Sequence, residues 1–108
     1  SGAQALAKEY GLDPGVLAEV GDLVAALHAR GLGGRASLDL GLARGLAYYS
    51  GMTFEIHHPL LAKEPRLCGG GRYDGLVRAL GGDEVPALGF AFGLERVAEA
   101  LDAEGVAL

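Results

Sequence analysis

Residues 38–55 read LDLGLARGLAYYSGMTFE, and this stretch determines the predicted fold. Apolar residues alternate with small or polar ones over residues 36–43, which is typical of a strand with one buried face. Gly45 interrupts the pattern, and a second alternation follows over residues 48–57. Two strands in direct succession, joined only by a bend or short turn, indicate an antiparallel sheet.

A helical segment is predicted before these strands, over residues 1–32. A short helix is expected at residues 4–10. Asp13 as N-cap, Pro14 in the first turn and Gly31 as C-terminal stop then bound a longer helix. Its apolar residues follow the three-and-four spacing of one buried face: Val16, Leu17, Val20, Leu23, Val24 and Leu27.

More elements are predicted after the two strands. In order they are a short strand at residues 66–68 that runs into three glycines, a helix at residues 73–80, a strand at residues 86–92 and a helix at residues 94–104. This order predicts an α+β fold, with an antiparallel sheet flanked by helices. We expect residues 1–108 to form a single-domain fragment, with the sheet portion over residues 36–108.

Composition excludes several classes of function. Half of the 108 residues are apolar, the net charge is −5 and the nine basic residues are scattered, so a duplex-binding face is not expected. One cysteine permits no internal disulfide, which favours a reducing cytoplasm. The longest nearly apolar run is too short for a membrane helix. No regular ligand spacing of cysteine and histidine is present, so no metal site is predicted.

The strand predicted at residues 86–92 has one face of small residues only, namely Ala87, Gly89 and Ala91. Glycine within a strand marks close approach by another backbone or by a ligand. Either a closely packed helix or a flat ligand is therefore expected above this face, and the spacing does not distinguish the two.

Two arginines are candidate anion-binding residues. Arg44 lies at the break between the first two strands, where it either faces solvent or reaches inward to a phosphate or carboxylate. Arg96 lies in the first turn of the last helix, where its charge opposes the helix dipole. It either pairs with Glu95 or Glu99 on a solvated face, or binds an anion together with the helix N-terminus.

Three stretches together resemble a known family, the class II aminoacyl-tRNA synthetases of the histidyl type. Residues 38–55 are similar to the family's histidine-binding signature, and residues 70–76, GGRYDGL, are similar to its second histidine signature. Residues 86–96, PALGFAFGLER, resemble class II motif 3, a strand and helix with an ATP-binding arginine.

The resemblance implies a role for each matching residue. In a synthetase, Arg44 would be catalytic and would act on the amino-acid carboxylate and the α-phosphate. The histidine-binding residues would be Arg44, Tyr48, Tyr49 and Tyr73, and the nucleotide-binding residues would be Gly89, Gly93 and Arg96. No cofactor is implied within this stretch, whereas ATP and Mg would bind in the complete protein.

Two kinds of protein share this core. One is the ligase that activates histidine with ATP and loads it onto tRNA-His. The other is the regulatory subunit of ATP phosphoribosyltransferase, a non-catalytic, histidine-sensing paralogue that supports the first step of histidine biosynthesis. Ala47 stands where the synthetase signature has an aspartate, so we expect the regulatory subunit, with the ligase as the alternative.

Either reading implies a cytoplasmic homo-oligomer that binds histidine. The regulatory subunit would also contact the catalytic subunit of ATP phosphoribosyltransferase. A structural fragment with a vestigial pocket is the third possibility. Class II motifs 1 and 2 are expected upstream and are not in this stretch, so these 108 residues alone should neither adenylate histidine nor bind ATP tightly.

Overall fold

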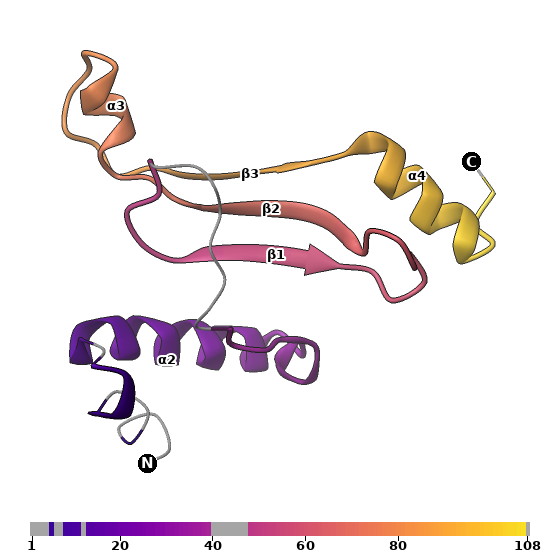
Figure 1. Cartoon of the computed structure of the whole chain (residues 1–108), viewed down its shortest axis with the longest axis horizontal. Coiled ribbons are helices and arrows are strands. Elements are labelled where there is room, and N and C mark those ends of the chain that lie inside the picture. Colours follow the sequence, from indigo (N-terminus) through magenta and orange to yellow (C-terminus); the bar gives the residue numbers. More distant parts are fainter. Residues whose placement is uncertain (1–4, 6–7, 12, 40–47, 108) are drawn as a thin grey trace. The chain divides into compact units, whose positions relative to one another are not determined.

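The computed structural model describes residues 5, 8–11, 13–39 and 48–107 (Figure 1). The chain divides into two compact units, Ser1–Leu40 and Gly41–Leu108. The first unit holds helix α2 (Pro14–Ala29) and the short 3₁₀ helix η1 (Gly33–Arg35), and the second holds the sheet. The single domain predicted for the whole chain stays a prediction.

Helix α2 begins and ends where the sequence predicted. The Asp13 side chain caps its start, because Oδ1 accepts a hydrogen bond of 2.7 Å from the Gly15 N–H. At its end Gly31 adopts a φ of +74°, and the Leu32 N–H donates to the Leu27 carbonyl at 2.9 Å. Only glycine takes this left-handed conformation readily, so Gly31 closes the helix.

The predicted buried face of α2 is not buried within its unit. No residue of α2 is buried, and Val16 and Val24 are 52% and 41% exposed. The apolar residues of α2 therefore form a stripe along the helix, but no segment in the described part of the first unit buries this stripe.

The strand predicted over residues 36–43 is absent from its described part, residues 36–39. The 3₁₀ helix η1 ends just before this segment, and at the start of the segment the Ala36 N–H donates to the Gly33 carbonyl at 3.5 Å. Its remainder, residues 40–43, lies outside the described residues.

Three antiparallel strands form the sheet, in the order β1-β2-β3. Their bounds are β1 (Thr53–His57), β2 (Arg66–Arg72) and β3 (Leu88–Phe92), and β2 is central (Figure 1). The predicted α+β class is thus confirmed. β1 and β3 begin later than the predicted starts at residues 48 and 86.

Strand β2 extends through all three glycines, although the predicted strand ended before them. A Cβ atom on Gly70 would contact the Gly89 carbonyl oxygen and lie 2.8 Å from the Phe90 Cα. β2 and β3 thus approach each other too closely at this point for any side chain. The glycines extend the central strand because they permit this approach.

Helix α3 (Leu76–Ala79) is shorter than the helix predicted at residues 73–80. The Tyr73 N–H donates to the Ala87 carbonyl at 2.8 Å, and the Asp74 N–H donates to Ser50 Oγ at 2.9 Å. Both groups are therefore committed to the neighbouring chain, and helical bonding starts only after them.

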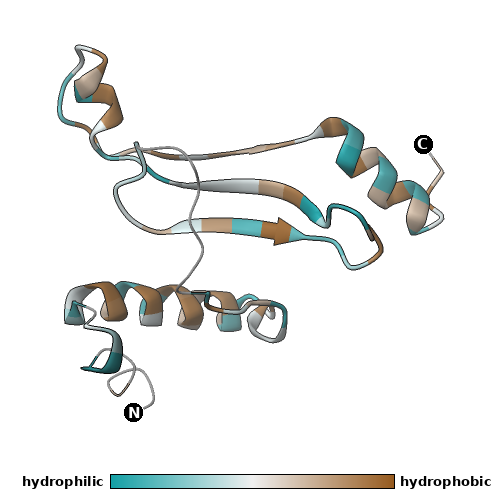
Figure 2. Cartoon of the chain, in the orientation of Figure 1, coloured by the Kyte–Doolittle hydropathy of each residue, from teal (hydrophilic) through white to brown (hydrophobic). Residues whose placement is uncertain are grey.

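Helix α4 (Leu94–Ala103) follows β3 at one end of the sheet, whereas α3 lies at the other end (Figure 1). Figure 2 shows hydrophobic and hydrophilic residues mixed along α4, as expected for an amphipathic helix. Ala100 is its buried residue at 6% exposure, but Leu94, predicted on the apolar stripe, is 73% exposed. Leu61 and Cys68 are the other buried apolar side chains among the described residues.

Candidate functional site

The strand register separates the two faces of the sheet as the alternation predicted. Cα partners place the following six residues on one side, here called the small-residue face: Thr53, Glu55, Gly69, Gly71, Gly89 and Ala91. The opposite side carries Phe54, Phe90 and Phe92, whose rings lie 6.5 and 6.4 Å apart in successive pairs. The sheet therefore has one apolar side and one side with little side-chain volume.

Three tyrosines gather into a cluster, and all three were predicted to bind histidine. The ring centroids of Tyr48 and Tyr49 lie 4.9 Å apart, those of Tyr48 and Tyr73 lie 5.7 Å apart, and those of Tyr49 and Tyr73 lie 6.4 Å apart. Tyr48 is 40% exposed, and Tyr49 and Tyr73 are partly buried. This tyrosine cluster presents aromatic surface and hydroxyl groups at one place.

The tyrosine cluster covers one half of the small-residue face. A Cβ atom on Gly71 would lie 2.8 Å from Tyr49 Cδ1, and a Cβ atom on Gly89 would contact the Tyr73 hydroxyl. The predicted open space is therefore filled here by the chain's own side chains. Gly89, predicted to flank a nucleotide, lies under Tyr73.

Asp74 organises the backbone around this cluster, and the residue-by-residue reading of the sequence missed it. Arg72 Nε donates to both carboxylate oxygens of Asp74, at 2.9 and 2.7 Å. The Ala87 N–H donates to Asp74 Oδ1 at 3.2 Å, and the Asp74 N–H donates to Ser50 Oγ. Asp74 thus joins the bend before β1 to the end of β2 and the start of β3. Its position within the GRYDG motif was the available signal.

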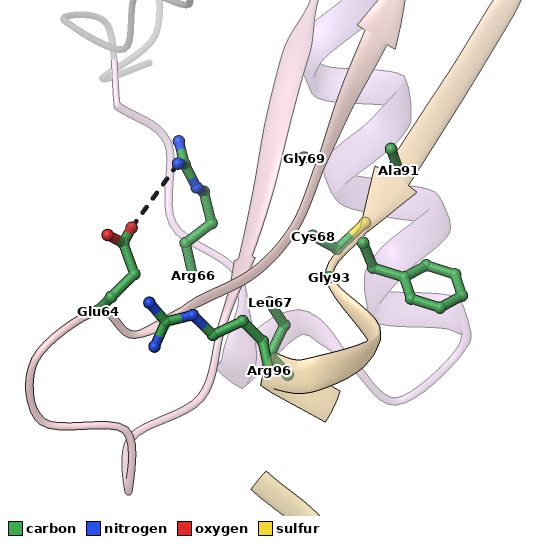
Figure 3. A pocket seen from close by; sticks show the side chains of 9 residues that line it. Glu64, Arg66, Leu67, Cys68, Gly69, Ala91, Gly93 and Arg96 are labelled. Atoms are coloured by element: carbon green, nitrogen blue, oxygen red, sulfur yellow. Dashed lines mark ion pairs between the residues drawn. The ribbon is translucent and has the colours of Figure 1, made fainter. Parts of the chain in front are cut away.

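At its other end the small-residue face borders a pocket of about 360 Å³, here called the arginine pocket, whose lining also includes Cys68 and Phe92 from the opposite side of the sheet (Figure 3). Gly69 and Ala91 contribute little side-chain volume to it, and Gly93 is the N-cap of α4 beside it. The lining residues are Glu64, Arg66, Leu67, Cys68, Gly69, Ala91, Phe92, Gly93 and Arg96.

Arg96 pairs with a glutamate of its own helix, as the first of the two explanations expected, whereas its anion-binding role stays a prediction. Its Nη1 lies 3.2 Å from Glu99 Oε2 in an ion pair on α4, and its side chain also lines the arginine pocket. A Cβ atom on Gly93 would be 3.3 Å from Arg96 Cγ, so glycine permits the arginine to lie close to the start of the helix. The structure therefore brings Gly93 and Arg96 together at the arginine pocket. Gly89, which was predicted to bind the nucleotide with them, does not line this pocket.

Arg44 and Ala47 lie outside the described residues, so their predicted roles stay predictions. Over the described ranges, no group of three or more histidine, cysteine, aspartate or glutamate residues could hold a metal ion. Within the same ranges, every helix is too short or too polar to cross a bilayer.

Comparison with known proteins identifies the family. The model of the family described as histidyl-tRNA synthetase matches residues 2–97. The chain belongs to the histidyl-tRNA synthetase family. The histidine–tRNA ligase of Thermus thermophilus is 47% identical over 111 residues, which cover 97% of this chain and 26% of the ligase. That of Fervidobacterium nodosum is 57% identical over 65 residues, covering 60% of this chain and 15% of the ligase.

A solved structure supports the same family and the fold. The crystal structure of apo S. aureus histidyl-tRNA synthetase is similar with a TM-score of 0.74 and 36% identity. The similarity covers 90% of this chain and 25% of that synthetase. The three-stranded antiparallel sheet and its helices therefore match part of a class II aminoacyl-tRNA synthetase core. The chain spans about a quarter of the length of the Thermus thermophilus ligase and of the S. aureus synthetase.

Proposed function

We propose that this chain forms part of the histidine-activating site of a histidine–tRNA ligase. The observation that carries the proposal is the placement of the tyrosine cluster and the arginine pocket at opposite ends of the small-residue face. Aromatic and hydroxyl groups for an imidazole lie at one end, and guanidinium groups for phosphates lie at the other. The ligases named above, which are similar over most of this chain, support the ligase over the regulatory subunit.

Activation joins the histidine carboxylate to the α-phosphate of ATP and releases pyrophosphate. In the proposed reaction the tyrosine cluster holds the imidazole and so aligns the carboxylate with the α-phosphate. Arg44 offsets the negative charge that develops between them, and Arg96 binds the phosphate tail. A magnesium ion bound with ATP supplies further neutralisation of the phosphates.

One sequence feature favours a second candidate, the histidine-sensing regulatory subunit of ATP phosphoribosyltransferase. Ala47 stands where the ligase signature has an aspartate, so a charge expected beside the histidine pocket is missing. In this candidate histidine binds without being activated, and shifts how the subunit contacts its catalytic partner.

Histidine-dependent ATP–pyrophosphate exchange by the intact protein separates the two candidates. We expect exchange, a strong loss of exchange in Arg96→Ala, and wild-type exchange in Arg78→Ala. Arg78 is a matched control because it pairs with Glu84 on the exposed α3 segment and does not line the arginine pocket. Histidine binding without any exchange would reject the ligase in favour of the regulatory subunit.

Charging of tRNA-His is the second test of the ligase. The purified protein should attach histidine to tRNA-His, and should not need the catalytic subunit of ATP phosphoribosyltransferase. We also expect a cytoplasmic homo-oligomer. Light scattering of the purified protein tests its oligomeric state.

A further inference from the structure

Arg66 lines the arginine pocket from the start of β2, and the family signatures do not include it. Its guanidinium is held by two carboxylates of different character. Nη1 donates a hydrogen bond of 3.2 Å to Glu55 Oε1, whereas Nη2 lies 3.7 Å from Glu64 Oε1. The second distance is too long for a hydrogen bond, so only charge attraction joins Arg66 to Glu64.

The two carboxylates also differ in how firmly they are held. The Glu55 side chain is 14% exposed, lies on β1, and is 3.0 Å from His57 Nε2. Glu64 is 47% exposed and lies on the irregular connection between β1 and β2. Glu55 therefore fixes one edge of the Arg66 guanidinium, and Glu64 is the weaker partner, because an exposed ion pair contributes little free energy.

Two guanidinium groups, those of Arg66 and Arg96, line the same pocket. Arg66 comes from β2 and Arg96 from the first turn of α4, and in Figure 3 their guanidinium groups lie on either side of the Glu64 carboxylate. Gly69 and Ala91 in the same lining leave room for a ligand. A guanidinium fork matches the oxygens of phosphate, so two forks on different elements fit a chain of several phosphates.

We propose that Arg66 is a second phosphate-binding residue of this site, which holds the triphosphate of the nucleotide together with Arg96. Glu64 is the carboxylate that the phosphates displace from Nη2, while Glu55 keeps the guanidinium in place. The identity of the ligand as a nucleoside triphosphate rests on the proposed function, whereas the polyphosphate site rests on the geometry of the two arginines.

Isothermal titration of the intact protein with inorganic tripolyphosphate, and then with ATP, tests this inference. Arg66→Met should weaken tripolyphosphate binding about five- to ten-fold, the effect of losing a charge-assisted hydrogen bond at a half-exposed site. Glu64→Gln should strengthen it roughly three-fold, because the competing charge is removed. Arg78→Met, the matched control, should bind as the wild type does.

Each outcome decides the inference independently of the ligase activity. Wild-type affinity in Arg66→Met, or no tripolyphosphate binding by the wild type, would overturn the inference even if pyrophosphate exchange is present. Arg66-dependent tripolyphosphate binding without exchange would support the site and reject the ligase. If Arg66→Met does not fold, Glu64→Gln decides: a gain in affinity supports the inference and unchanged affinity overturns it.

Discussion

The hydroxyl group of Tyr73 occupies the space above Gly89 that a Cβ atom would need. Tyr49 lies in the same way against Gly71, the β2 partner of Gly89 in the register. Two adjacent glycines on neighbouring strands thus form the floor on which the tyrosine cluster rests. The position of the cluster depends on the absence of two side chains.

Replacing Gly89 with alanine should displace Tyr73 and cost little stability. The new Cβ would meet only the far end of the tyrosine side chain, which can rotate away, so the free energy of unfolding should fall by only about 1 kcal/mol, the lower end of the cost of overpacking. Histidine affinity should fall several-fold if the cluster binds the imidazole. Denaturant unfolding and calorimetry measure the two effects. Gly75→Ala, where a Cβ meets nothing within 4 Å, is the control.

Gly70→Ala, in contrast, should lower the stability of the protein strongly. Its Cβ would meet the backbone of Gly89 and Phe90, which cannot move without separating β2 from β3. Overpacking of this kind costs about 2–3 kcal/mol. Urea unfolding monitored by circular dichroism checks the value. A variant as stable as the wild type would show that the two strands are not this close.

Asp74→Ala should loosen the chain around Tyr73. The substitution removes the acceptor for Arg72 Nε and for the Ala87 N–H, and we expect a loss of about 1 kcal/mol because both charged side chains are partly exposed. Asp74→Asn keeps one acceptor oxygen and should lose less. Amide hydrogen exchange at Ala87 should speed up in the alanine variant. Unchanged exchange there would contradict the role given to Asp74.

Gly31→Ala should shorten or destabilise α2. Alanine disfavours the φ of +74° observed at this position, so the loss should be about 1 kcal/mol. Gly21→Ala is the matched control within the helix, where a Cβ meets nothing within 4 Å and φ is not positive. It should instead stabilise the helix by roughly 0.5–1 kcal/mol. Far-ultraviolet circular dichroism during thermal unfolding compares the two variants, and a shift of the same sign in both would refute the argument.

The sequence by itself determined the elements that depend on neighbouring residues. Asp13 and Gly31 bound α2 because capping acts over a few residues, and the alternation from Thr53 to His57 and from Leu88 to Phe92 put the right residues on each face of the sheet. The three signature stretches also identified the family, since they preserve residue types and spacing. Preference for the regulatory subunit rested on departures from the ligase signature such as Ala47, and the similar ligases do not support it.

Only the tertiary structure decided how the small-residue face is used. The sequence pattern showed that this face has little side-chain volume. Whether a ligand or a tyrosine occupies the space above the face depends on contacts between segments that are distant in sequence. The same holds for Asp74, whose partners Ser50 and Ala87 lie 24 and 13 residues away, and for Arg66, whose anchor Glu55 lies 11 residues away. Local spacing determines which way a side chain points, whereas the pairing of strands determines what it meets there.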